Sequence, residues 1–227
     1  MKRTLAALLL GSLCLGLCVG GAGVAHADCD TRLGWIDARL VRTARRARIW
    51  SWSWGIVLGA STVGSLVVVP FVSDEERPDW YVNVFTSGVG MLPLLIAPLP
   101  VMHDGDTLHG KLAGLPAGGD RCALLAEAEI MLARDAEGEA AGRAWWNHAL
   151  NLVLNGGAGL FLGLVYDRWQ SALLTAVGGT AVGEVMIFTQ PVDSVDDLRA
   201  YRSGAIALTV RPMTSPGHIG LVLMGSW

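Results

Sequence analysis

Two long apolar segments between Trp145 and Gln190, separated by the short polar link 166–169, constrain the fold of this chain most strongly. Each segment contains about 20 residues, and an α-helix of that length spans about 30 Å, the thickness of the hydrocarbon core of a bilayer. The two segments therefore predict a helical hairpin that crosses a membrane twice.

Polar residues inside this hairpin are concentrated on one side. Asn147, Asn151 and Asn155 recur every four residues, so they share one face of a helix, and His148 lies beside them. When the hairpin is folded at its link, Glu184 of the second segment lies level with Asn151. We expect an intramembrane polar cluster in which Glu184 points towards Asn151.

Three interpretations of Glu184 are open. A lone carboxylate in hydrocarbon costs between about 2.5 and more than about 10 kcal/mol. A neutral Glu184 that is hydrogen-bonded to Asn151 would avoid much of this cost and would hold the two helices in register. Alternatively, the cluster conducts protons or a solute, or Glu184 lies in the aqueous headgroup region.

Two further apolar stretches, residues 50–72 and 80–102, predict two more membrane-length helices. Tryptophans at 50, 52 and 54 suit an interfacial belt; their alternation would also suit a barrel strand, but the run that follows is twice as long as such a strand. Prolines at 93, 98 and 100 should kink or unravel the last third of the second stretch. An apolar fraction of 52% and a charged fraction of 16% agree with a membrane protein.

The first 27 residues are typical of a secretory signal peptide. Lys2 and Arg3 precede an apolar run, and Ala25-His26-Ala27 offers a cleavage site. An uncleaved membrane anchor is the alternative. Either interpretation places residue 28 onward outside the cytoplasm, in a bacterial cell envelope.

An amphipathic helix is predicted before each hairpin, at residues 28–48 and 121–143. We expect the first helix to lie on the membrane surface, where Arg39, Arg42 and Arg46 reach lipid headgroups. The alternative is a helix packed on the rest of the protein, with its charged face in solvent.

Residues 103–120, which follow the first hairpin, are expected to form a mobile loop because they are rich in Gly, Asp and Pro. His103, Asp104, Asp106 and His109 belong to residue types that bind metals. Their spacing matches no metal-binding motif, so we predict no metal site.

The two hairpins and their preceding helices form similar units, residues 28–103 and 104–195, and each unit ends near a Pro-Val pair. We therefore predict a tandem repeat of one surface helix and one membrane hairpin. Small residues spaced four apart allow close packing of the membrane helices, within the chain or against another copy or another envelope protein. Residues 196–227 alternate in polarity around a Ser-Pro-Gly-His turn and predict a small C-terminal β-hairpin.

Cys29 and Cys122 are the two cysteines that would remain after cleavage of the signal peptide. Each precedes the surface helix of its repeat, and the exported chain would lie in an oxidising compartment. We predict a disulfide between them; two independent thiols are the alternative.

The distribution of cations conflicts with the usual topology of inner-membrane proteins. If residue 28 lies outside, the outer segments contain thirteen of the 17 Lys and Arg residues and the two inner links contain two, which inverts the positive-inside rule. An outer-membrane location, burial of the hairpins in an assembly, or an incorrect signal assignment would each resolve the conflict. The choice between inner and outer membrane stays open.

The expected function is that of a non-catalytic structural or scaffold component of the envelope, in contact with membrane lipids. No catalytic constellation, cofactor motif or basic field for nucleic acid is evident in a chain of net charge −3. The alternative is a channel or transporter subunit that uses the polar cluster around Glu184.

Overall fold

The computed structural model describes the backbone of residues 2–204, 209–215 and 218–224, and the side chains of residues 29–204. Four helical rods are long and apolar enough to cross a membrane: Cys29–Phe71, Arg77–Ala113, Arg121–Tyr166 and Trp169–Arg202. The prediction of a helical protein with four membrane-length helices is therefore confirmed.

Several of these rods consist of more than one helix. The first consists of α1 (Lys2–Val68) from Cys29 onward and a 3₁₀ turn, η1 (Val69–Phe71). The second contains α2 (Arg77–Ile96) and α3 (Val101–Ala113). The third contains α4 (Arg121–Gly142) and α5 (Trp145–Tyr166). The fourth contains α6 (Trp169–Leu174), a π-helical turn η2 (Thr175–Gly179), α7 (Thr180–Thr189) and α8 (Asp193–Arg202).

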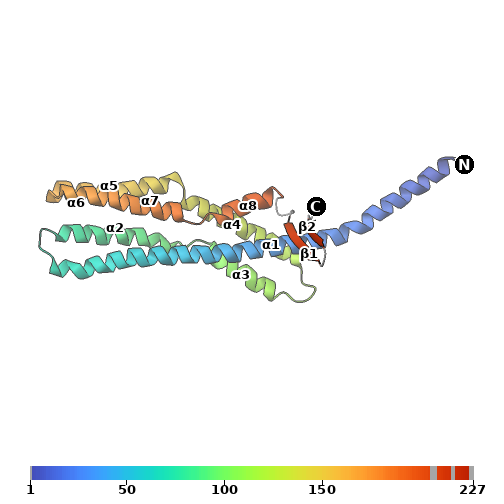
Figure 1. The fold of residues 1–227 in the computed structure, drawn as a ribbon, viewed down its shortest axis with the longest axis horizontal. Helices are drawn as coiled ribbons and strands as arrows, with labels where there is room; N and C mark the ends of the chain where they lie inside the picture. The colour runs from blue at the N-terminus through green and yellow to red at the C-terminus, as the bar shows by residue number, and fades with distance from the viewer. Residues whose placement is uncertain (1, 205–208, 216–217, 225–227) are drawn as a thin grey trace.

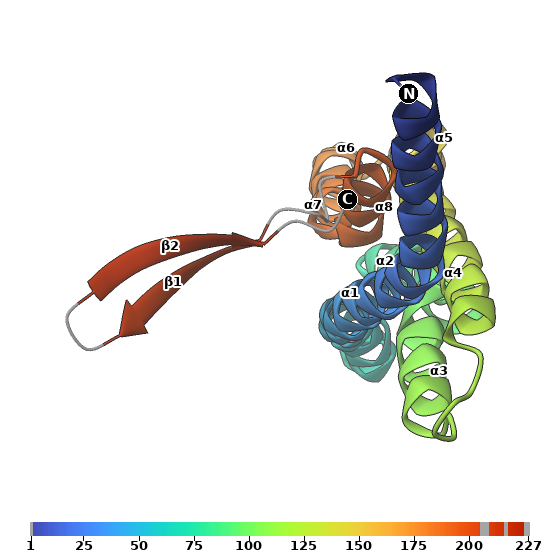
Figure 2. The same cartoon turned by 90° about the vertical axis from the view of Figure 1, so that its right-hand side faces the viewer.

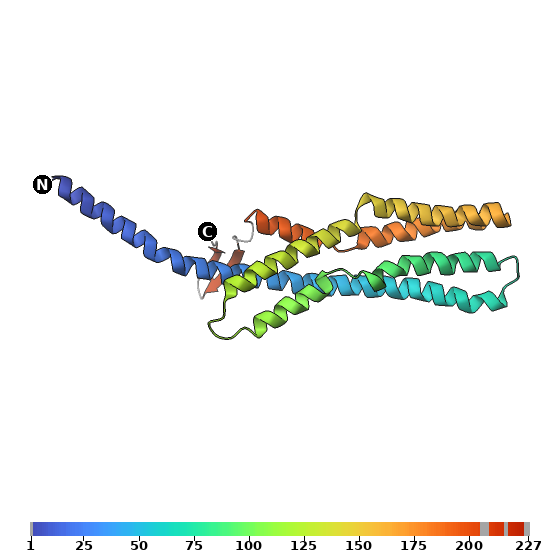
Figure 3. The ribbon, with the colours of Figure 1, turned by 180° about the vertical axis from the view of Figure 1, so that it is seen from behind.

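The apolar halves of the rods form two membrane hairpins that extend in the same direction (Figures 1 and 3). We call α2 and the part of α1 after residue 48 hairpin 1, and α5 with α6, η2 and α7 hairpin 2. The outward faces of both hairpins carry large apolar side chains that are more than half exposed, including Ile56, Val63, Leu164 and Leu173. Such faces suit contact with lipid.

The other halves of the rods form a four-helix bundle, which consists of residues 29–48 of α1 together with α3, α4 and α8. Leu33, Ile36 and Leu40 of α1 are at most 1% exposed and pack in one core with Leu108 of α3 and Leu132 of α4. The expectation of a separate helix on the membrane surface is therefore wrong. The apolar stripe of residues 28–48 is covered by α3 and α4, and α1 continues without a break into hairpin 1.

The expected loop at residues 103–120 is largely helical, since α3 begins at Val101 and only residues 114–120 link it to α4. Gly105 was one reason to expect a loop, but in the structure it serves close helix packing and not a turn. A Cβ atom on Gly105 would lie 2.8 Å from the backbone oxygen of Leu40 in α1, so a glycine lets the two helices approach here. The predicted disruption by proline is confined to the break between Ile96 and Val101.

Helix α8 was not expected from the sequence, and its residues fall partly in the predicted second repeat and partly in the predicted tail. The first turn of α8 contains Asp193 and Asp196, and its last turn contains Arg199 and Arg202, as the helix dipole favours. This order of charges is the sequence feature that could have predicted α8. Beyond α8, strands β1 (Thr209–Ser215) and β2 (His218–Met224) pair antiparallel (Figure 2); the link between them, residues 216–217, lies outside the described residues.

Candidate membrane-embedded polar site

Glu184 of α7 makes two contacts with α5. Its Oε1 accepts a hydrogen bond of 3.0 Å from Asn151 Nδ2, and its Oε2 lies 2.5 Å from His148 Nδ1. The side chain of Glu184 is 27% exposed. The carboxyl group thus faces the helix interface, as expected, and links the two arms of hairpin 2.

Two glycines of hairpin 2 leave room for the asparagine side chains. A Cβ atom on Gly183 would lie 2.0 Å from Asn151 Oδ1, and one on Gly179 would lie 2.1 Å from Asn155 Oδ1. Asn155 Nδ2 in turn donates to Asn151 Oδ1 over 2.8 Å. The polar face of α5 and the small-residue face of the fourth rod are therefore complementary.

Asn147 does not belong to this cluster, contrary to the expectation. Its Nδ2 donates to the backbone oxygens of Ala141 and Gly142, at 2.7 and 2.9 Å. Asn147 lies in the first turn of α5, where its amide reaches the carbonyl groups at the end of α4. Its role is to stabilise the joint between the two helices.

We expect Glu184→Leu to lower the free energy of unfolding by about 1–2 kcal/mol, because the amide of Asn151 and the ring of His148 lose their acceptor. The free energy of unfolding of Glu184→Gln should stay close to that of the original chain, since the amide oxygen of glutamine still accepts a hydrogen bond from Asn151. Denaturation in mild detergent measures both values. Equal stability of the leucine variant and the original chain would contradict a role in helix register.

Hairpin 1 has a polar set of its own that the sequence analysis did not identify. Asn83 Nδ2 donates to Ser61 Oγ over 3.0 Å and to Ser65 Oγ over 2.6 Å. The hydroxyl groups of Thr62 and Ser87 lie 2.8 Å apart. The signal was present as two polar pairs with helical spacing, Ser61 with Ser65 on α1 and Asn83 with Ser87 on α2.

The two hairpins are joined at both ends of their apolar parts. At the end remote from the bundle, Arg168 Nη2 lies 2.5 Å from Asp79 Oδ2, and Ser171 Oγ donates to the same oxygen over 2.8 Å. At the bundle end, the indole nitrogens of Trp50 and Trp54 donate to Thr189 Oγ1 over 3.3 and 3.1 Å. These contacts hold the hairpins at a fixed spacing.

Between these two junctions lies a cleft of about 570 Å³, which we call the interhairpin cleft. Its polar lining comes from both hairpins: Ser61, Asn83, Thr86 and Ser87 from hairpin 1, and Asn151, Asn155, Ser171 and Thr175 from hairpin 2. Thr175 and Gly179 bound the π-helical turn, an irregularity that often marks functional sites in helices. Asn83 is exposed to this space.

Two of the three arginines assigned to lipid headgroups bind α8. Arg39 Nη1 lies 2.8 Å from Asp197 Oδ1, and Arg46 Nη1 lies 2.6 Å from Asp193 Oδ1. Part of the charged face of α1 thus lies against an acidic helix that was not expected, and the headgroup role of Arg39 and Arg46 stays a prediction. Arg42 is exposed, and its headgroup role stays a prediction.

Three of the four residues considered as metal ligands are engaged in separate ion pairs. Asp104 Oδ2 lies 2.5 Å from Arg134 Nη2, and Asp106 Oδ2 lies 2.7 Å from Arg48 Nη2. His109 Nδ1 lies 3.1 Å from Asp37 Oδ2. Within residues 29–204, no three histidine, cysteine or acidic side chains are grouped so that they could hold a metal ion.

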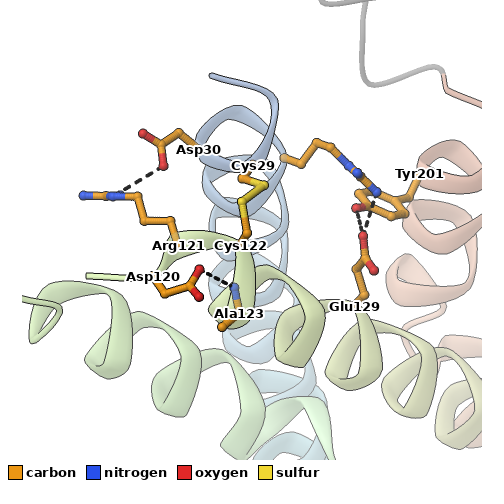
Figure 4. The surroundings of a disulfide bond; sticks show 9 residues. Cys29, Asp30, Asp120, Arg121, Cys122, Ala123, Glu129 and Tyr201 are labelled. Carbon is orange, nitrogen blue, oxygen red and sulfur yellow. Dashed lines mark hydrogen bonds and ion pairs between the residues drawn. A yellow bond between two sulfur atoms is a disulfide. The ribbon is translucent and has the colours of Figure 1, made fainter. Parts of the chain in front are cut away.

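Cys29 and Cys122 form the predicted disulfide, with their Cα atoms 5.3 Å apart (Figure 4). The bond joins α1 to the first turn of α4. Beside it, Arg121 Nε lies 3.4 Å from Asp30 Oδ1, and Asp120 caps α4 by accepting a 2.9 Å hydrogen bond from the backbone nitrogen of Ala123. Covalent and capping interactions thus meet at this end of the bundle.

Two carboxyl groups are fully buried in the bundle, on α4. Burial raises the pKa of Glu139 to about 7, although its carboxylate accepts hydrogen bonds of 2.7 and 2.9 Å from the backbone nitrogen and the hydroxyl of Ser194. Burial and the neighbouring Asp104 carboxylate raise the pKa of Asp135 to about 8. A protonated Asp135 can donate a hydrogen bond to Asp104.

The chain was compared with family models, curated proteins and solved structures, and none of them matches it.

Proposed function

We propose that the chain is an integral membrane protein in which the interhairpin cleft admits a small polar solute, and thus a channel or transporter subunit. The observation that carries this proposal is that polar side chains of both hairpins line the same 570 Å³ space, with Asn83 exposed to it. An exposed carboxamide surrounded by hydrocarbon is unfavourable, whereas one that faces water is not.

The junctions at both ends of the cleft support this proposal. The Arg168–Asp79 pair and the tryptophan contacts of Thr189 fasten the hairpins on either side of the space. A gap left by loose packing would need no such fastening. The sequence alone favoured a scaffold because only hairpin 2 had a recognised polar set, and the Asn83 set of hairpin 1 removes that objection.

The structural role is a second candidate, which the disulfide-linked bundle favours. A bundle crosslinked between Cys29 and Cys122 is suited to hold two hairpins at one membrane face. In both proposals residues 1–27 form a signal peptide, the chain resides in a bacterial envelope with its bundle outside the cytoplasm, and it has no catalytic activity. The tandem repeat of residues 28–103 and 104–195 and the C-terminal β-hairpin within residues 196–227 are part of the same proposal.

Cysteine accessibility in proteoliposomes tests the first proposal. Asn83→Cys places a thiol in the cleft. Val63→Cys places one on the lipid-facing side of α1, where Val63 is 60% exposed. Val63 lies level with Asn83, because it stands between the two serines that Asn83 contacts. We expect a charged, membrane-impermeant thiol reagent to modify Asn83→Cys at least about tenfold faster, because only the cleft contains water. Cys14 and Cys18 are replaced by serine, and the native disulfide is kept.

A second pair of cysteine variants, on hairpin 2, controls for local effects at Asn83. Thr175→Cys lines the cleft, and the nearby Leu173→Cys faces lipid with 65% of its surface exposed. If both cleft positions react as slowly as their lipid-facing partners, the cleft is dry, and the structural role replaces the transport role.

A further inference from the structure

We infer that the solute admitted by the interhairpin cleft is small, uncharged and rich in hydroxyl groups, as a short polyol is. This inference rests on the proposed function, in which a solute passes through the interhairpin cleft, and adds the chemical class of that solute. We call this movement of solute the passage. Three properties of the cleft carry it: the charge of its lining, its hydrogen-bonding groups and its size.

The surface that a solute would touch carries almost no free charge. Asp79 is the one ionisable residue of the lining, and Arg168 and Ser171 both bind its carboxylate. Glu184 is not part of the lining, and its carboxylate accepts a hydrogen bond from Asn151, which is. A bare ion in the cleft would lose its hydration shell and meet no opposite charge, which is costly.

The lining instead offers groups that both donate and accept hydrogen bonds. Each asparagine has two donor hydrogens and an acceptor oxygen, and each hydroxyl has one donor hydrogen and two lone pairs. The two observed bonds of Asn83 use its amide nitrogen, and its oxygen is a further acceptor. Side chains of this kind can exchange hydrogen bonds with the hydroxyl groups of a polyol, each of which also donates and accepts.

The size of the cleft fits the same class. Binding sites for small molecules generally enclose about 300–1,000 Å³, and the cleft of about 570 Å³ lies within this range. A water molecule takes up about 30 Å³ in the liquid. A polyol of three to five carbons would therefore fit together with several waters.

Solute uptake by proteoliposomes that contain the full chain tests the inference, with glycerol and xylitol as probes. In stopped-flow light scattering we expect glycerol permeability to rise at least about threefold over protein-free vesicles. Asn83→Leu should abolish the increase because it removes the exposed amide, whereas the lipid-facing control Val63→Leu should retain it. Potassium and proton fluxes, followed with fluorescent dyes, should equal those of empty vesicles.

A binding measurement covers the case in which the cleft holds a solute without releasing it quickly. Saturating xylitol should slow the modification of Asn83→Cys by the charged thiol reagent, while potassium chloride of equal osmolarity should not. Protection by xylitol supports the inference even if glycerol flux is small.

The outcomes separate the inference from the proposed passage. If Asn83→Cys reacts readily but neither polyol protects it or permeates, the passage stands and the assigned solute class is wrong. A potassium or proton flux that Asn83→Leu abolishes would overturn the class in the same way. If the cleft cysteines do not react at all, the passage itself fails.

Discussion

Replacing Asp135 by asparagine is expected to stabilise the bundle at pH 8 and to remove much of its dependence on pH. In the folded chain, burial and the Asp104 carboxylate raise the pKa of Asp135 to about 8, whereas the unfolded chain should titrate near the ordinary value of about 3.9. Between these values the folded state binds a proton that the unfolded state does not bind.

The sign of the effect follows from this difference. Stability contributed by the protonated Asp135 is fully present below about pH 4 and is lost as the pH rises towards about 8. Each pH unit in this window costs at most about 1.4 kcal/mol, so the loss between pH 5 and pH 8 is at most about 4 kcal/mol. Glu139, whose pKa is raised to about 7, adds a smaller loss of the same sign.

Asparagine is neutral at every pH, so it avoids the repulsion between the Asp135 and Asp104 carboxylates that raises the pKa of Asp135. At pH 8 we expect the free energy of unfolding of Asp135→Asn to exceed that of the original chain by about 2 kcal/mol. At pH 5 the two free energies should agree within about 1 kcal/mol. Hydrogen exchange of the α4 amides between pH 5 and pH 8, corrected for the intrinsic exchange rate, measures this difference.

Glu137→Gln is the matched control, since it removes one negative charge from the same helix at an exposed position. It should leave the pH dependence of the original chain unchanged. An Asp135→Asn variant that loses stability with pH as steeply as the original chain would show that Asp135 is ionised in the folded state.

The membrane part of this fold follows largely from the sequence, because hydrocarbon imposes simple requirements on length and polarity. The apolar stretches, the break after Ile96 and the contact of Glu184 with Asn151 could all be anticipated from run length, proline positions and helical spacing. The disulfide between Cys29 and Cys122 could be anticipated from the count of cysteines in an exported chain.

The bundle was less predictable because its helices are stabilised by contacts with one another. Residues 103–113 contain Gly105 and Gly110 and resemble a loop until the approach of α1 to Gly105 is known. The amphipathic stripe of residues 28–48 has the same pattern whether it meets lipid or α4. Only the position of α8 reveals that Arg39 and Arg46 face acidic partners.

The interhairpin cleft was the least predictable feature, because it depends on how two hairpins face each other. Asn83 alone in a long apolar run resembles a residue that fixes helix register, and it does contact Ser61 and Ser65. Its second role, as part of a lining shared with Asn151 and Thr175, requires the spacing between hairpins that the Arg168–Asp79 pair sets.

Loss of the disulfide should cause the largest change in the stability of the bundle. The bond closes a loop between residues 93 positions apart, and restricting the unfolded chain in this way stabilises the fold by about 4–5 kcal/mol in the chain-entropy model. The value is an upper limit, because the membrane already restricts the unfolded chain. The neighbouring ion pair of Asp30 and Arg121 is about half exposed and contributes at most about 1 kcal/mol, so it cannot replace the bond.

We therefore expect reductant to lower the thermal midpoint of the bundle in detergent and to release exchange protection in α1 and the start of α4. The double variant Cys29→Ser, Cys122→Ser should begin at the reduced midpoint and should not respond to reductant, which separates loss of the crosslink from other effects of the reagent. Freshly extracted chain should react with a thiol reagent at these two positions only after reduction. Two reactive thiols before reduction would show that the bond does not form in the membrane, and the case for placing the bundle in an oxidising compartment would then lose its main support.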